Sequence, residues 1–106
     1  MSYTLQGIIT KVEGDAYSMN VYIHGDNTYN SKNICIEDET ETKSNGYQKA
    51  ILIPMDKNFE LPVNSIIREL VLNVFTNKSK AIFSIDLNNQ KFTLTKITIK
   101  QNSNEK

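Results

Sequence analysis

One amphipathic segment constrains the fold of this chain more than any other feature. Its apolar residues recur with the spacing of one helical face, about 100° per residue. They are Ile66, Ile67, Leu70, Val71, Val74 and Phe75. Polar residues occupy the opposite face, which only Leu72 interrupts, and the strict alternation of a strand is absent. The pattern therefore predicts a helix over residues 64–77 that leads directly into a strand.

The other apolar segments have the pattern of β-strands. We predict strands over residues 3–12, 18–24, 48–55, 80–87 and 91–100. The last two form a hairpin over the turn at Asn88–Gln90, and Gly7 marks a bulge or a sharp bend in the first strand. Residues 33–36 are either an extra strand or part of a long excursion.

The order of these elements is strand, strand, strand, helix, strand, strand. It predicts a mainly β fold, a five-stranded OB-like barrel with one helix near residues 64–77 that closes one end of the barrel. A chain of 106 residues is expected to be a single domain, here over residues 1–100. A mobile acidic loop is predicted near residues 37–47, and a disordered tail over residues 101–106.

The charge balance limits the classes of partner. Twelve Lys and Arg residues balance twelve Asp and Glu residues, so no net field draws the chain to a phosphate backbone or an anionic membrane. No segment reaches the length of a membrane span, and no signal peptide is visible. The single cysteine cannot form an internal disulfide. We therefore predict a cytoplasmic protein without a membrane partner, with secretion as the alternative if a leader has been removed.

Few residues could carry catalysis. His24 is the only histidine, which excludes a histidine-based triad and a multi-histidine metal site. Cys35 lies between two isoleucines and is expected to be a buried apolar residue rather than an activated thiolate. The acidic run over residues 37–41 lacks the ligand spacing and the central glycine of an EF-hand loop. We predict no enzyme, no cofactor and no metal site.

Two passages resemble a known family in layout. They are "IIRELVLNVFTNKSKAIFSID" at residues 66–86 and "FTLTKITI" at residues 92–99, and in the order of their elements they resemble the OB-fold B-subunits of bacterial AB5 toxins. The resemblance implies a bacterial protein and a ring-forming subunit whose helix faces its neighbours.

An OB-fold binds ligands on the face of its second and third strands. In this sequence that face has Asn20, Tyr22 and His24 on the second strand, Tyr47 and Lys49 at the start of the third, and Lys91 on the rim. Exposed tyrosines beside lysines suit base stacking with phosphate contact. They suit sugar rings equally well, and they also occur on half-exposed sheets for packing alone.

The polar side of the predicted helix has a second contact stripe. Ser65, Glu69, Leu72 and Thr76 follow the i, i+4, i+7, i+11 spacing, and we name Glu69, Leu72 and Thr76 as interface candidates. We therefore predict a non-catalytic protein-interaction or self-assembling OB-like module, with a ring-forming subunit as one form. A single-stranded nucleic-acid-binding protein is the alternative, and a glycan-binding toxin-like subunit is a weaker one.

Overall fold

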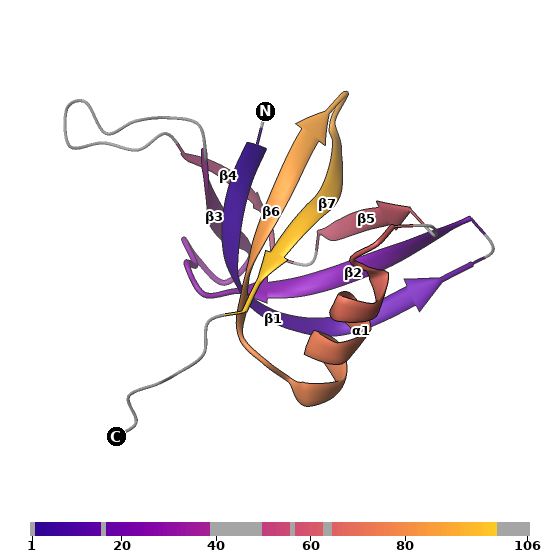
Figure 1. The fold of residues 1–106 in the computed structure, drawn as a ribbon. Helices are drawn as coiled ribbons and strands as arrows, with labels where there is room; N and C mark the ends of the chain where they lie inside the picture. Colours follow the sequence, from indigo (N-terminus) through magenta and orange to yellow (C-terminus); the bar gives the residue numbers. More distant parts are fainter. Residues whose placement is uncertain (1, 16, 39–49, 56, 63–64, 100–106) are drawn as a thin grey trace, which may run out of the picture.

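The computed structural model describes residues 2–15, 17–38, 50–55, 57–62 and 65–99. These residues form a mainly β protein with one helix, as predicted. The described elements are β1 (Ser2–Gly14), β2 (Ser18–Gly25), β3 (Asn33–Asp38), β4 (Ala50–Pro54), β5 (Asn58–Pro62), α1 (Arg68–Asn77), β6 (Ala81–Asn88) and β7 (Lys91–Thr98) (Figure 1). The described part thus has seven strands, two more than the sequence predicted, because residues 33–36 do form a strand and because β5 was not anticipated.

Five of these strands pair with one another in a closed cycle. β1 pairs with β2, β2 with β5, β5 with β7, β7 with β6, and β6 with β1. Every pairing is antiparallel except the one between β5 and β7, where Glu60 lies opposite Thr93. Strands β3 and β4 form a hairpin outside this set, and β3 joins the sheet through the start of β1.

A strand forms within residues 48–55, as predicted, but its expected place beside β2 was wrong. The strand that pairs with β2 is β5, whereas the segment expected in that position forms β4, which pairs with β3. In β5 only Phe59 and Leu61 are buried, and they alternate with Asn58 and Glu60. Two apolar residues before a proline give too short an alternation to be recognised beside the longer apolar run in residues 50–55.

Strand β1 bends near its middle and so serves two parts of the sheet (Figure 1). Its first half pairs with β6 and its second half with β2, and both pairings include Gly7. The register against β2 shifts between Ile9 and Lys11, so the bulge lies at Thr10. Of the two alternatives predicted for Gly7, a bulge or a sharp bend, the bend is the one that fits, because β1 changes partners there. A bulge adds a residue and increases the local twist, which allows one strand to change direction.

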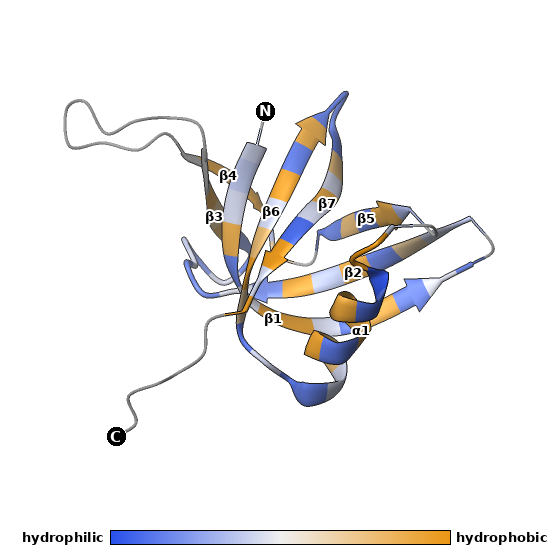
Figure 2. Cartoon of the chain, in the orientation of Figure 1, coloured by the Kyte–Doolittle hydropathy of each residue, from blue (hydrophilic) through white to orange (hydrophobic). Residues whose placement is uncertain are grey.

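The helix covers the core with fewer residues than its sequence suggested. Val71 and Val74 are fully buried, and Ile67 and Leu70 pack partly against the core. The predicted burial of the remaining two apolar positions was wrong, since Ile66 is 96% exposed and Phe75 is 36% exposed. The helix begins at Arg68 and not at residue 64, so Ile66 precedes it and does not follow helical spacing. Figure 2 shows the resulting mixture of apolar and polar bands along α1.

Two hairpin turns follow local chemistry. The Asp15 carboxylate accepts hydrogen bonds from the backbone N–H groups of Tyr17 (2.8 Å) and Ser18 (2.9 Å) between β1 and β2. Asn89 and Gln90 both have positive φ, 53° and 65°, which is the geometry of a two-residue type I′ turn between β6 and β7.

The predicted acidic loop falls only partly within the described residues. Its first two residues, Glu37 and Asp38, belong to β3, where they lie opposite Thr4 and Tyr3 of β1. The prediction that the loop begins at residue 37 was therefore wrong. Residues 39–49 and the predicted tail at 101–106 lie outside the described residues.

Candidate binding surfaces

The outer face of β2 carries three of the predicted ligand-face residues. Asn20 and Tyr22 are half-buried and His24 is exposed, while Met19, Val21 and Ile23 between them are buried. Strand β2 therefore alternates as the sequence indicated. Tyr47 and Lys49 lie outside the described residues. Strand β4, which they were expected to enter, is not a neighbour of β2.

Strand β5 supplies the groups that the sequence reasoning missed on this face. The side-chain amide of Asn58 donates to Oδ1 of Asn20 over 2.8 Å. Glu60 lies opposite Asn20 in the ladder and forms an ion pair with Lys91 of β7, with Nζ and Oε1 2.8 Å apart. The structure therefore joins Asn20 and Lys91 into one polar surface through β5. The alternation of polar and apolar residues in "NFELP" was the available signal.

A hollow of about 410 Å³ adjoins Tyr22 at one end of this face. Nζ of Lys11 lies 5.1 Å from the centroid of the Tyr22 ring, and the Tyr22 hydroxyl donates to Oε1 of Glu13 over 3.2 Å. The ring is therefore held over its face by Lys11 and at its hydroxyl by Glu13. The hollow is lined by Thr10, Lys11, Tyr22, Ile23, His24 and Met55.

The lysines of this face are paired with carboxylates. Nζ of Lys11 lies 3.2 Å from Oε2 of Glu13, and Lys91 is paired with Glu60. The hydrogen bond from Lys11, then the hydrogen bond from the Tyr22 hydroxyl and the charge of Lys11 lower the pKa of Glu13 below its ordinary value. A glutamate is ionised at neutral pH even at its ordinary pKa, so the carboxylate of Glu13 balances the charge of Lys11.

The three interface candidates on the helix are exposed. Glu69, Leu72 and Thr76 all face away from the core, and Leu72 is 39% exposed. Phe75 lies one residue from this stripe and extends its apolar part. The sequence placed Phe75 in the core, so this neighbour of Leu72 was missed.

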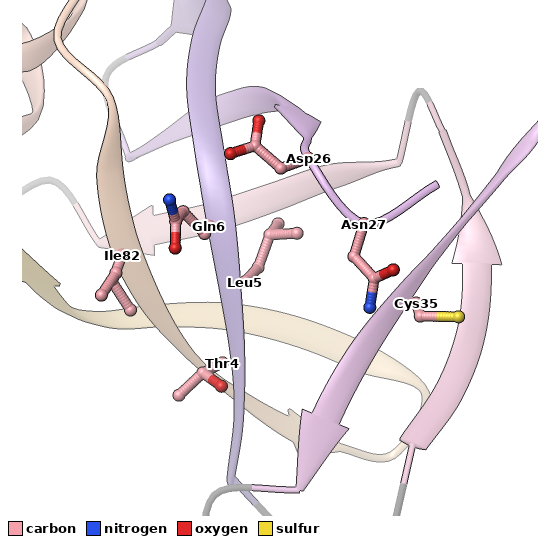
Figure 3. A pocket seen from close by; sticks show the side chains of 7 residues that line it. All are labelled: Thr4, Leu5, Gln6, Asp26, Asn27, Cys35 and Ile82. Atoms are coloured by element: carbon pink, nitrogen blue, oxygen red, sulfur yellow. The ribbon is translucent and has the colours of Figure 1, made fainter. Parts of the chain in front are cut away.

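A second hollow of about 430 Å³ extends across β1, from Ile82 of β6 on one side to Cys35 of β3 on the other (Figure 3). The N–H of Asp26 donates to the carbonyl oxygen of Gln6 (2.8 Å), and the N–H of Cys35 donates to that of Asn27 (2.8 Å). Residues 26–27 therefore lie between β1 and β3 at the level of Gln6 and Cys35, whereas the two strands pair directly at Tyr3 and Thr4. Asp26 is paired with Lys80 at 3.0 Å. The hollow is lined by Thr4, Leu5, Gln6, Asp26, Asn27, Cys35 and Ile82.

Cys35 is half-buried, whereas the sequence predicted a buried residue. The structure shows why: the side chains of β3 alternate, so Ile34 and Ile36 enter the core and Cys35 lies on the other face. Within the described residues no three His, Cys, Asp or Glu side chains cluster in a way that could hold a metal ion. In the same residues no helix is long and apolar enough to span a membrane.

Comparison of the chain with protein-family models, with curated proteins and with solved structures finds no match.

Proposed function

We propose that the five strands β1, β2, β5, β7 and β6 form an OB-like barrel with α1 at one end. Three observations support this. The pairings of these strands form a closed cycle, β5 and β7 are parallel, and α1 follows β5 and precedes β6. The β3–β4 hairpin is then an insertion between the second and third strands of the barrel.

We further propose that the chain is a non-catalytic protein-interaction module that assembles with copies of itself. The observation that carries this proposal is the apolar surface of α1 and of the turn before it. Leu72 and Phe75 remain partly exposed although the same helix buries Val71 and Val74, and Ile66 is almost fully exposed. Leu72 and Phe75 are three residues apart on the helix and so lie beside each other, and adjoining exposed apolar side chains are typical of a protein contact.

The rim of this surface suits a protein contact. Arg68 and Glu69 are exposed beside the apolar residues, and exposed charges of both signs at a rim give orientation more than affinity. The balanced charge of the whole chain also allows copies to approach without long-range repulsion.

The test is the molar mass in solution by light scattering for the wild type and for Leu72→Asp. A carboxylate in place of Leu72 would have to be buried without a partner in the contact, so the mass should fall. Asn73→Asp is the control, because it adds the same charge at the neighbouring exposed position. An equal mass for the wild type and Leu72→Asp would contradict the helix contact.

Single-stranded nucleic-acid binding is the second candidate, supported by the hollow beside Tyr22. An aromatic ring next to Lys11 and His24 suits base stacking with phosphate contact. It ranks second because Lys11 and Lys91 are already paired with carboxylates, and a phosphate would have to displace them.

Fluorescence anisotropy with a labelled oligonucleotide tests this candidate across salt concentrations. The affinity should fall steeply as the salt concentration rises. It should also fall in Tyr22→Ala but not in the control Tyr29→Ala, because Tyr29 is 66% exposed and does not line the hollow. Absence of binding at low salt would remove the candidate.

A further inference from the structure

Strand β4 ends the sheet that the described residues form. It pairs with β3 on one side, and none of the described strands pairs with its other side. In Figure 1 the β3–β4 hairpin and helix α1 lie on opposite sides of the molecule. Any contact that β4 makes is therefore separate from the helix surface discussed above.

The register shows which backbone groups of β4 point to this free edge. The N–H of Met55 donates to the carbonyl oxygen of Lys32 over 2.7 Å, and hydrogen-bonded pairs alternate along an antiparallel ladder. Ile53 and Ile51 then bond to β3, and Leu52 directs its N–H and C=O away from it. Cys35 lies opposite Leu52, and its N–H donates to Asn27 on the side of β3 away from β4. Cys35 and Leu52 therefore do not bond to each other, which agrees with this alternation.

The side chains hold β4 in place, and only Pro54 at its end is of a type that protects a strand edge. Ile53 is buried and Ile51 packs partly against the core, so the strand is anchored on one face. Leu52 is 48% exposed on the other face. Residues 50–54 carry no charge, although charged side chains are a common means of keeping a second strand away from an exposed edge.

We propose that the free edge of β4 pairs with the same edge of a second copy of this chain, antiparallel and with a two-fold axis at Leu52. Leu52 then exchanges both of its backbone hydrogen bonds with Leu52 of the second copy. The N–H of Ala50 reaches the carbonyl oxygen of Pro54 of the second copy. The two Leu52 side chains lie side by side and cover each other.

The proline at this edge limits the pairing but leaves most of its hydrogen bonds. Pro54 has no N–H to donate, so in the two-fold register its carbonyl oxygen accepts from Ala50 of the second copy, while the carbonyl oxygen of Ala50 gains no hydrogen bond from Pro54. The same patch on both copies is the usual form of a symmetric dimer contact. The inference adds a second surface to the self-assembly proposed above, and it does not use the helix contact.

Disulfide trapping tests the register. The test is made in a Cys35→Ser, Leu72→Asp background, which removes the native thiol and the helix contact. Directly opposite hydrogen-bonded residues have Cα atoms about 5.5 Å apart, within the range that a disulfide bridges. Leu52→Cys should therefore form a disulfide-linked dimer under mild oxidation, seen by non-reducing electrophoresis. Tyr29→Cys, at an exposed position outside β4, is the control and should remain monomeric.

Light scattering supplies the second readout in the same background without added cysteines. Leu52→Lys places two like charges side by side at the axis and should raise the dimer dissociation constant by about tenfold or more. No cross-link with Leu52→Cys, or equal cross-linking with Tyr29→Cys, would overturn the inference. If the wild type still exceeds the monomer mass in that case, self-assembly stands and only the β4 contact is lost.

Discussion

The backbone carbonyl oxygen of His24 lies so close to Gly7 that a Cβ atom at position 7 would overlap it. This contact occurs where β1 changes partners, because Gly7 lies opposite both Gly25 of β2 and Ala81 of β6. A strand that serves two neighbours at a bend needs a residue without a side chain at that point.

Gly7→Ala should therefore destabilise the fold by about 2–3 kcal/mol, since the clash is with backbone that cannot move alone. Gly14→Ala is the matched control, because a Cβ atom there would meet only an ordinary contact with Ser18 at 3.6 Å. Urea unfolding of the two variants measures the difference. Equal destabilisation would show that the close approach at Gly7 is not rigid.

Truncation of Phe59 tests the assignment of β5 to the core. Phe59 is fully buried and packs edge-on against Phe92, with ring centroids 5.9 Å apart, so Phe59→Ala should destabilise by about 3–5 kcal/mol. Leu52→Ala, in the segment that the sequence favoured as third strand, should change the unfolding free energy by less than about 1 kcal/mol in the monomer. The reverse order in denaturant unfolding would contradict the observed pairing of β5 with β2.

The Asp15 turn gives a pH-dependent prediction. Hydrogen bonds from the N–H groups of Tyr17 and Ser18 lower the pKa of Asp15 below its ordinary value of 3.8. A lowered folded-state pKa adds stability that is present above the ordinary pKa and is lost as the pH falls through the folded-state pKa. In thermal unfolding, the melting temperature of the wild type should exceed that of Asp15→Asn at neutral pH. The two melting temperatures should converge below the ordinary pKa of Asp15. A gap that stays constant with pH would contradict this.

Local patterns were sufficient for several elements. The helix, the alternation of β2 and the β6–β7 hairpin were all predicted, because each depends on side-chain periodicity or turn chemistry over neighbouring residues. The outward positions of Asn20, Tyr22 and His24 follow from the same alternation.

Long-range pairing could not be predicted from such patterns. Whether residues 50–54 or residues 58–62 lie beside β2 depends on which strand can reach it, and the more apolar segment was preferred incorrectly. The polar contact of Asn58 with Asn20 was missed as a consequence. The exposure of Phe75 was missed because Phe75 lies at the boundary of the apolar face. The exposure of a side chain at such a boundary depends on which residues pack beside it in space.

The molar mass of the wild-type chain in solution tests self-assembly most directly. Light scattering over a dilution series should give a mass above the 12.1 kDa of one chain at high concentration, falling toward it on dilution. A mass of one chain at every concentration would contradict the assembly of this module through either of its exposed surfaces.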